Sequence, residues 1–339
     1  MLESLLLIAR DLRASDIHLS AGMPPMLRVN GDLQVLDHPV LGNSQVRAMI
    51  DTVLPESQRR LFSEGAACDF AFASPSEGLG RYRANAYRQQ RGVALALRPI
   101  PETVPSLESI AAPAILKQLA GVDHGLVLVV GLTGSGKSTT LAAMTDYINQ
   151  TAAKHVLTIE DPVEFVYEAQ KCLVTQREVG RDTPSFADAL KAALREDPDV
   201  ILLGEMRDLE TIRLALTAAE TGHLVLATLH TATAPQAIER IVDVFPGEER
   251  DLARTLLADV LRAVVAQQLI ARSDGQGRVA AHEILVGTPA VRNLIRESKT
   301  AQLISAMQTG QPQGMQTMAQ SVEQLVRMGL INSRSQISH

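Results

Sequence analysis

The chain has 339 residues, of which 46% are apolar and 21% are charged, and this length and composition predict two packed domains. The formal net charge is −6 and no dense block of Lys and Arg occurs, which counts against a protein dedicated to gripping nucleic acid. Two cysteines, Cys68 and Cys172, exclude a disulfide scaffold and a four-cysteine zinc site, and no run approaches the roughly 20 apolar residues that a transmembrane helix needs.

The first hundred residues predict a small α+β domain. Apolar side chains recur at helical spacing over residues 2–12, and Glu3 precedes the apolar run, so this segment predicts an amphipathic helix and not a secretion signal. Residues 44–61 form the most helical stretch. Short runs separated by turn signals such as Asn30-Gly31 predict strands. These runs cover residues 17–19, 26–29, 33–36, 70–72, 82–87 and 93–98.

Three prolines, Pro99, Pro101 and Pro105, interrupt this pattern. Proline fixes φ and removes a backbone donor, so the stretch predicts an extended linker over residues 99–108. The first domain is therefore expected over residues 1–98 and the second over residues 109–339.

The second domain predicts an α/β fold with a parallel sheet, because buried apolar runs alternate with helical stretches. The runs cover 126–130, 156–159, 200–203 and 224–229, and the helices cover 139–150, 185–195 and 208–221. Beyond Val265 the pattern predicts mostly helix, so we expect a helical C-terminal region from about residue 270. Thr288 and Pro289 fit the cap and first position of a helix over 290–307, and a last helix is expected near 315–328.

A glycine-rich segment follows the first apolar run of this domain. Residues 131–139 read Gly-Leu-Thr-Gly-Ser-Gly-Lys-Ser-Thr, which fits the phosphate-binding pattern of Gly, four residues and Gly-Lys-Ser/Thr. Gly134 and Gly136 free the backbone so that amides converge on phosphate oxygens, beside the positive end of a helix that begins near Lys137. Lys137 would reach the β- and γ-phosphates of ATP, and the Ser138 hydroxyl would bind Mg²⁺. The predicted binding residues are Gly131, Thr133, Gly134, Ser135, Gly136, Lys137, Ser138 and Thr139.

Polar residues follow the other three apolar runs. In open α/β sheets ligands bind beyond the carboxyl ends of the strands, so these residues should meet at one edge. Glu205 is a candidate to orient the attacking water or take its proton, with Arg207 two residues further on. Glu160 and Glu164 could polarise water or assist Mg²⁺. His230 could sense the γ-phosphate through a hydrogen bond.

Each of these residues also has a plainer interpretation. The glycines could form a turn that happens to precede a lysine. Glu205 could be a solvated residue that opens the next helix, where the helix dipole favours a carboxylate. Asp161-Pro162 could be a turn, and His230 could be a hydrogen-bonded polar group at a strand end.

Phosphoryl transfer also calls for a cation at the γ-phosphate, and a neighbouring subunit can supply it. Arginines are plentiful in both domains, and most arginines on a surface do no more than interact with water. The candidates for action in trans are Arg83, Arg98, Arg195 and Arg240.

Taken jointly, these segments resemble the secretion-type hexameric ATPases, and among them the retraction ATPases of type IV pili. The resemblance covers nearly the whole chain. It is carried by 15–20 (Ser-Asp-Ile-His-Leu-Ser), the phosphate loop, 158–165, 197–208, 228–231 and 290–297. Three positions depart from the common pattern. Gly204 stands where the second nucleotide-binding motif of P-loop ATPases ends in Asp, Leu132 where the family often has proline, and Gly180 where histidine is expected.

The resemblance implies a PAS-like first domain, a RecA-like core, and ATP with Mg²⁺ held between the subunits of a homo-hexameric ring. It further implies cytoplasmic docking at the inner membrane, on a pilus platform protein. The function it predicts is an ATP-driven motor that retracts pili by disassembling pilin, and so powers twitching motility. A signature associated with retraction corresponds to Ala290, Val291, Arg292, Asn293, Leu294, Ile295, Arg296 and Glu297.

Four alternatives stay open. A pilus-extension or type II secretion ATPase of the same family usually carries a four-cysteine zinc element, which two cysteines cannot supply. An accessory retraction ATPase is disfavoured by residues 290–297. A RecA-like nucleic-acid translocase is disfavoured by the acidic balance of the chain. The fourth alternative is a sensor that binds ATP without hydrolysing it, and this hypothesis predicts that Glu205→Gln leaves turnover unchanged.

Overall fold

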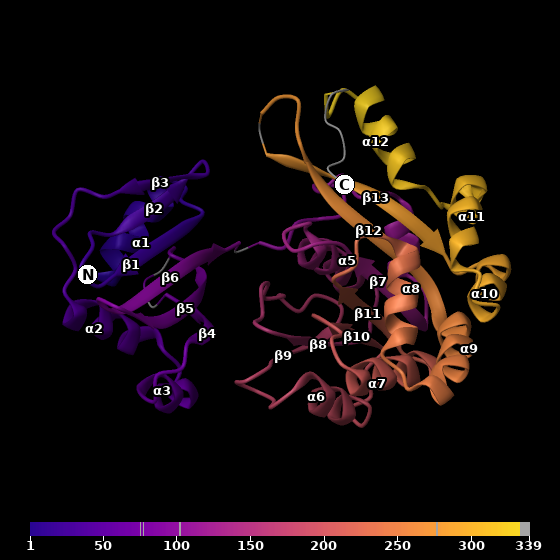
Figure 1. The fold of residues 1–339 in the computed structure, drawn as a ribbon, viewed down its shortest axis with the longest axis horizontal. Helices are drawn as coiled ribbons and strands as arrows, with labels where there is room; N and C mark the ends of the chain where they lie inside the picture. The colour runs from indigo at the N-terminus through magenta and orange to yellow at the C-terminus, as the bar shows by residue number, and fades with distance from the viewer. Residues whose placement is uncertain (75, 77, 102, 276, 333–339) are drawn as a thin grey trace. The chain divides into compact units, whose positions relative to one another are not determined.

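The computed structural model describes residues 1–74, 76, 78–101, 103–275 and 277–332, and the chain divides into two compact units (Figure 1). The first unit comprises Met1–Thr103 and Pro162–Val166, and the second comprises Val104–Asp161 and Tyr167–His339. The border between Thr103 and Val104 falls inside the stretch 99–108 that the sequence assigns to a linker.

The first unit is built on an antiparallel sheet with the strand order β3-β2-β1-β6-β5-β4. All the strands predicted for this region are present. The first helix buries leucines at helical spacing in the core of the unit, as predicted. The elements are α1 (Leu2–Asp11), β1 (Asp16–Ser20), β2 (Met26–Val29), β3 (Asp32–Val35), α2 (Asn43–Val53), α3 (Glu56–Ser63), β4 (Cys68–Ala73), β5 (Arg81–Gln89) and β6 (Gly92–Ile100).

The structure refines two details of the first unit. The predicted helical stretch 44–61 contains two helices separated at Leu54, which precedes Pro55 and is extended with φ −70° and ψ 125°. Strand β6 continues to Ile100, so an extended linker cannot begin at residue 99. Beyond Leu97, β6 pairs with β5 alone, and such an edge position tolerates Pro99.

The second unit is built on a sheet with the strand order β13-β12-β7-β11-β10-β8-β9, in which β13 is antiparallel to β12 and the other pairs are parallel. The four predicted apolar runs are its central strands, which confirms the α/β class. The strands are β7 (Gly125–Val130), β8 (His155–Glu160), β9 (Leu173–Glu178), β10 (Val200–Leu203), β11 (Leu224–Leu229), β12 (Leu261–Ala271) and β13 (Arg278–Val286). The helices are α4 (Ile115–Ala120), α5 (Lys137–Thr151), α6 (Phe186–Ala193), α7 (Leu209–Glu220), α8 (Ala234–Asp243), α9 (Arg250–Val260), α10 (Pro289–Arg296), α11 (Leu303–Thr309) and α12 (Met318–Arg327).

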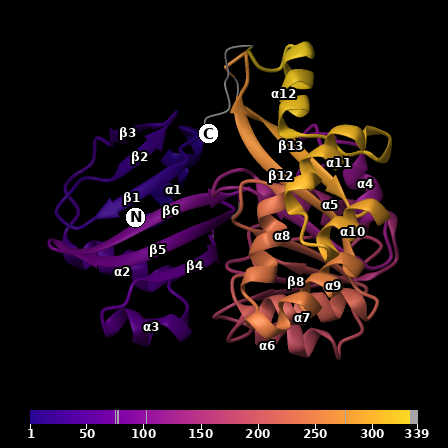
Figure 2. The same cartoon turned by 45° about the vertical axis from the view of Figure 1, so that its right-hand side comes forward.

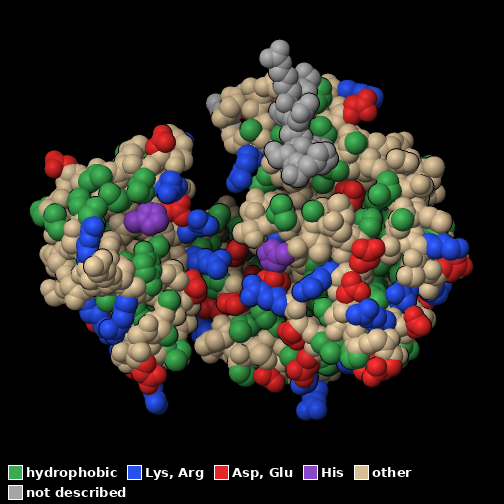
Figure 3. Space-filling view, in the orientation of Figure 1, with side chains coloured by type: hydrophobic (Ala, Val, Ile, Leu, Met, Phe, Trp, Pro, Cys, Tyr) green, Lys and Arg blue, Asp and Glu red, His purple; other side chains and the backbone are tan. Residues whose placement is uncertain are grey.

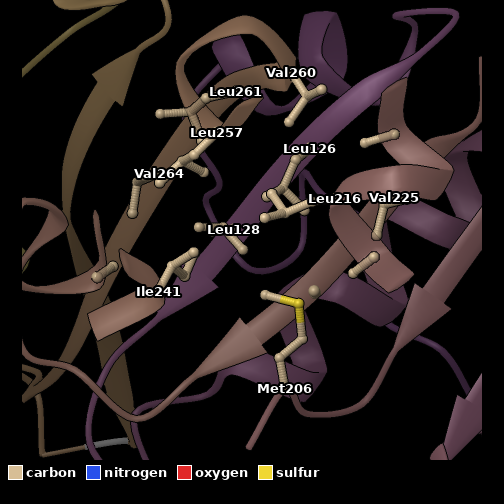
Figure 4. Packing of buried hydrophobic residues seen from close by; sticks show 14 of the residues in the cluster. Leu126, Leu128, Met206, Leu216, Val225, Ile241, Leu257, Val260, Leu261 and Val264 are labelled. Atoms are coloured by element: carbon tan, nitrogen blue, oxygen red, sulfur yellow. The ribbon is translucent and has the colours of Figure 1, made fainter. Parts of the chain in front are cut away.

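Alternate residues of the central strands face opposite sides of the sheet, which gives the second unit two cores. On one side, Leu126 and Leu128 of β7 pack with Leu216 of α7 and Leu257 of α9 (Figure 4). On the other side, Val127 belongs to a core shared with α4 and α5. Helices α6, α7, α8 and α9 gather on the first side, as Figure 2 shows. Among the described residues, no helix is long and apolar enough to cross a bilayer.

The region after Val265 differs from the prediction. Strand β12 continues to Ala271 and β13 follows, so the helical region begins at Pro289 and not near residue 270. Strand β12 lies between β7 and β13, and Ala263–Ala266 is buried on both sides. A buried position between two paired strands outweighs the helical propensity of the alanines. The prediction was wrong because β12, which is apolar apart from Arg262, Gln267 and Gln268, has no two-residue alternation that separates a buried strand from a buried helix.

The predicted helix over 290–307 is also interrupted. Helix α10 ends at Arg296 and α11 begins at Leu303. Between them Ser298 has a φ of +57°, a left-handed conformation that cannot continue a helix. Strand β9 was not predicted at all, because it is a half-exposed edge strand without the apolar character of its neighbours.

Candidate nucleotide site

The four predicted site segments meet at one edge of the second sheet. Strands β7, β11, β10 and β8 are neighbours and run parallel, so their carboxyl ends lie side by side. The phosphate loop follows β7, His230 follows β11, Glu205 follows β10, and Glu160 ends β8. The expected convergence at a strand-end edge is therefore confirmed.

The phosphate loop owes its path to three glycines with positive φ. Gly131, Gly134 and Gly136 have φ of +150°, +79° and +88°, which side chains with a Cβ rarely permit. A Cβ on Gly131 would lie 2.5 Å from the Gln267 carbonyl oxygen, so this position is closed to a side chain as well as strained. Helix α5 begins at Lys137, as predicted, and its first-turn amides face the loop. Leu132, which departs from the family pattern, has an exposed side chain, and its carbonyl oxygen accepts from the Ser135 amide at 3.2 Å.

Lys137 lies inside the loop. Its side chain is buried, and Nζ donates to the carbonyl oxygens of Gly131 at 2.8 Å and Leu132 at 3.1 Å. The same Nζ lies 3.5 Å from Nδ1 of His230. In contrast, the neighbouring Ser138 is exposed on the first turn of α5, so its hydroxyl is open to a metal ion or phosphate. The loop thus fits a polyphosphate with a bound cation.

Glu205 lies in the loop between β10 and α7 and does not open the helix. Helix α7 begins four residues later and is capped by Asp208, whose carboxylate accepts from the Thr211 backbone at 2.8 Å. The loop is held by β11, because the Thr228 hydroxyl donates to the Gly204 carbonyl oxygen at 2.6 Å. The Glu205 side chain is only 16% exposed. The interpretation of Glu205 as a solvated helix-opening residue is therefore wrong.

Two side chains bind the Glu205 carboxylate. Arg207 Nη2 donates to Oε2 at 2.6 Å, and His230 Nε2 lies 3.2 Å from Oε1. Burial alone would raise the pKa of Glu205, but the hydrogen bond from Arg207 and the charges of His230 and Arg207 outweigh it and lower this pKa. Glu205 is therefore ionised at neutral pH. His230 connects it to Lys137, so one imidazole joins the phosphate loop to the carboxylate.

The two carboxylates of the β8 segment have different surroundings. Glu160 Oε1 accepts from the Thr158 hydroxyl at 2.7 Å and from Gln176 Nε2 at 3.4 Å, which fixes its position at the sheet edge. Glu164 belongs to Pro162–Val166, which groups with the first unit. The structure thus brings Glu160 to the strand-end edge and does not assign Glu164 to it.

The four candidate arginines are exposed. Arg83 on β5 and Arg98 on β6 occupy facing positions of the first sheet. Arg98 binds the Asp16 carboxylate at 2.7 Å. Arg195 follows α6, and Arg240 lies on α8 in the second unit. Their action in trans stays a prediction.

The segment 290–297 forms most of α10. Thr288 caps this helix through the Val291 amide. Val291 and Ile295 are fully buried, one turn apart, and anchor the helix in the core shared with α9. The opposite side is exposed, and there Asn293 Nδ2 donates to Glu297 Oε1 at 3.0 Å.

Sequence reasoning missed a residue that touches the phosphate loop. Gln267 of β12 is buried and its side-chain amide bonds the loop and the first turn of α5. The signal that could have found it is a pair of glutamines inside an otherwise apolar run, because a buried amide needs partners. Assigning that run to a helix obscured the signal.

A phosphate loop that opens a helix on a parallel sheet, with an ionised glutamate and a histidine at neighbouring strand ends, defines a P-loop ATPase with a RecA-like core. Residues 106–336 match the family described as type II/IV secretion system protein. The chain therefore belongs to that family, and within it groups with the type IV pilus retraction ATPases.

Three proteins illustrate the similarity. The chain is 56% identical over 319 residues to the type IV pilus retraction ATPase PilT of Pseudomonas aeruginosa, covering 94% of this chain and 92% of that protein. It is 52% identical to a twitching motility protein of Neisseria gonorrhoeae, covering 94% and 87%. The crystal structure of the pilus retraction motor PilT with bound ADP superposes with a TM-score of 0.90 at 47% identity, covering 98% of this chain and 94% of that one.

Proposed function

We propose that the chain is the subunit of a homo-hexameric motor that hydrolyses Mg²⁺-bound ATP and drives type IV pilus retraction, the disassembly of pilin that powers twitching motility. The observation that carries the proposal is the His230 imidazole, which lies 3.5 Å from Lys137 Nζ and 3.2 Å from Glu205 Oε1. It links Lys137, which would hold phosphate, to Glu205, which would direct water, and hydrolysis requires both of these roles. The names of the two relatives support pilus retraction as the work performed.

The phosphate loop would supply the binding. Its amides and Lys137 Nζ would hold the β- and γ-phosphate oxygens, after Nζ exchanges its present bonds to Gly131 and Leu132. The exposed Ser138 hydroxyl would hold Mg²⁺, and Thr133, Ser135 and Thr139 would complete the cradle. Bound Mg²⁺ neutralises charge that develops on the phosphate oxygens.

Glu205 would direct the attacking water. Each of its carboxylate oxygens is bonded to His230 or Arg207, and each keeps a second lone pair that can accept from water. Because its pKa is lowered, Glu205 is a weak base that orients water more than it removes the proton. Glu160 would steady the same edge, and Glu164 would contribute only if its segment approaches the nucleotide.

Positive charge for the transition state would come from a neighbouring subunit. We assign this role first to Arg83 and Arg98, because two guanidinium groups at facing strand positions can bind one anion together. Arg98 would exchange its present bond to Asp16 for the anion. Arg195 and Arg240 are the second choice, since each is exposed but lies outside the strands, where no cross-strand pairing places a second arginine opposite it. The role of α10 would be to pass motion to a pilus platform protein in the inner membrane, with the motor in the cytoplasm, as the resemblance to the retraction ATPases implies.

A nucleic-acid translocase with the same core is the competing function. On the face of the second unit shown in Figure 3, acidic and basic side chains are interspersed. This distribution and the net charge of −6 favour a protein substrate over a phosphate backbone. Filter binding to single-stranded DNA at low salt distinguishes the motor from a translocase. A translocase would bind the DNA and hold it on the filter, and the DNA would stimulate its ATP hydrolysis.

Two substitutions test the motor. Glu205→Gln should retain ATP binding and lower turnover by about 100-fold or more, because the water loses its ionised partner. Lys137→Ala should impair both binding and turnover. The measurements are nucleotide titration and release of inorganic phosphate by the assembled protein, with Glu210→Gln, an exposed carboxylate on α7, as the matched control. Unchanged turnover in Glu205→Gln would identify a protein that only binds ATP, and the proposal would fail.

A further inference from the structure

A single buried side chain joins the phosphate loop to the sheet. Gln267 lies in β12 and is 5% exposed. Its Nε2 donates to the Ser135 carbonyl oxygen at 2.8 Å, and its Oε1 accepts from the Thr140 hydroxyl at 2.7 Å. Both partners are buried. Ser135 precedes Lys137 and Thr140 follows it, so one amide fixes the chain on both sides of the phosphate-binding lysine.

The backbone around Gln267 shapes the loop as well. Strand β12 pairs in parallel with β7, and Ala266 is opposite Val130, the last residue before the loop. After Val130 the chain leaves the sheet to form the phosphate loop, whereas β12 continues to Ala271. The residues of β12 beyond Ala266 therefore lie next to the loop. A Cβ on Gly136 would lie 2.8 Å from Gln267 Nε2, and a Cβ on Gly131 would lie 2.5 Å from the Gln267 carbonyl oxygen. Two of the three loop glycines, Gly131 and Gly136, thus fit against this one residue.

The direction of Gln267 follows from strand alternation. Val265, two residues earlier, belongs to the core on the side of α5, and Gln267 faces that side too. Gln268 points to the opposite side and is only partly buried. The two adjacent glutamines therefore differ in their access to the phosphate loop, and Gln268 is also less buried than Gln267.

We propose that Gln267 is a positioning residue for nucleotide binding: its amide holds the phosphate loop and the first turn of α5 in the geometry that accepts the phosphates. This inference rests on the proposed function of the loop. Gln267 has no bond to Glu205, Arg207 or His230 among the described residues, so it acts on the bound phosphates and not on the water. Gln267 would hold the loop in the same way in the substrate complex and in the transition state. Such an interaction contributes equally to the binding of both, so its loss lowers nucleotide affinity more than kcat.

The test compares Gln267→Leu with Gln268→Leu. Leucine keeps the approximate size of the side chain and removes both bonds, leaving the Ser135 carbonyl and the Thr140 hydroxyl without partners. We expect Gln267→Leu to weaken the binding of ADP and of ATP about tenfold and to change kcat at saturating ATP by less than about threefold. Gln268→Leu should bind nucleotide as the wild type does. Equal affinities in Gln267→Leu and the wild type, or an equal loss in both variants, would overturn the proposal.

Thr140 provides a second route in case Gln267→Leu fails to fold. Thr140→Val removes one of the two bonds, and Thr140→Ser keeps the hydroxyl. The valine variant should lose affinity about threefold and the serine variant should match the wild type, with less than additive losses in the double variant Thr140→Val with Gln267→Leu. A lower kcat with unchanged affinity would mean that Gln267 acts on the reacting atoms, and would also overturn the proposal.

ADP titration separates this inference from the proposed function, because it needs no turnover. A protein that binds ADP tightly and never releases phosphate refutes the motor and leaves the role of Gln267 intact if the variant still loses affinity. A protein that hydrolyses ATP normally, with Gln267→Leu binding ADP at wild-type affinity, refutes only the inference.

Discussion

The two units place their charged side chains at different parts of their sheets. In the second unit strands β7, β11, β10 and β8 are parallel and end together, so Glu205, His230 and the phosphate loop reach one edge. In the first unit neighbouring strands end at opposite edges, and Arg83 and Arg98 lie side by side on a sheet face. A parallel sheet can thus build a pocket from its own groups. An antiparallel sheet can instead place charged side chains side by side on one face. Such a face suits contact with a nucleotide that is bound to a neighbouring subunit.

The strongest way to break this comparison is to remove the charged face. The double variant Arg83→Ala with Arg98→Ala should lower ATP turnover about 10³-fold, because an arginine supplied in trans is worth at least that much in phosphoryl transfer. Subunits carrying Lys137→Ala should be inactive for a different reason. Mixing the two inactive proteins should restore part of the phosphate release, since some interfaces then combine an intact loop with intact arginines.

Controls for this experiment come from both units. Arg195→Ala and Arg240→Ala test the candidates of the second unit, and Arg59→Ala tests an exposed arginine on α3. If turnover is lost only in Arg195→Ala or Arg240→Ala, the arginine that acts in trans belongs to the second unit. That result would refute the proposed role of the first sheet. No recovery on mixing, with the ring intact, would argue against action in trans.

A smaller effect is expected from the buried histidine of the second unit. Burial lowers the pKa of His282 to about 4, from an ordinary value of 6.5. Between these values the unfolded chain binds a proton that the folded chain does not, so stability falls as pH drops from 6.5 to 4 and is independent of this residue above 6.5. The loss amounts to about 3 kcal/mol. Denaturant unfolding at several pH values should show that His282→Phe lacks this loss, whereas His124→Asn, at an exposed histidine, retains it.

The exposed side of α10 should matter for retraction and not for hydrolysis. Asn293→Ala with Glu297→Ala leaves the buried anchors Val291 and Ile295 in place, so the helix should persist. We expect turnover within about twofold of the wild type and a retraction rate lowered about tenfold, the size of a moderate interface contact. Twitching assays and phosphate release measure the two effects. A parallel loss of turnover would show that α10 serves the ring itself.

The smallest effect is expected at an ion pair of the first unit. Burial would raise the pKa of Asp16, but hydrogen bonds from Arg98 and Ser15 outweigh burial and lower this pKa. The ionised Asp16 carboxylate therefore stabilises the fold above about pH 4, and this stabilisation is lost as the pH falls through the lowered pKa. Because Arg98 is 68% exposed, Asp16→Asn should cost only about 0.5 kcal/mol of unfolding free energy at pH 7. The difference between wild type and variant should narrow at pH 3. A cost that is independent of pH would assign the effect to packing.

The site was predictable where two independent signals coincide. A continuous apolar run that stops at a polar residue indicates both a buried strand and a strand-end ligand position, and this located Glu205 and His230. The pairing of both residues with each other was not predictable, because it depends on the spatial order β7-β11-β10-β8 and not on the chain order.

The errors have physical causes too. The alanines of β12 satisfy the requirements of a buried helix and of a buried strand, and only pairing with β7 and β13 decides between them. The break at Ser298 depends on one left-handed residue that has no special sequence preference for that conformation. In contrast, Gly180, with a φ of +82°, suits its turn better than the histidine expected there would.

The alternation along β12 sets a rule for engineering this protein. A single inserted or deleted residue between Val265 and Gln267 would rotate every later side chain to the opposite face and exchange Gln267 for its neighbour behind the phosphate loop. The hairpin tip around Ser273 and Gly275 lies beyond the paired residues and is exposed. A fluorescent reporter or epitope tag should therefore be spliced into that tip, where it leaves the frame of the strand unchanged.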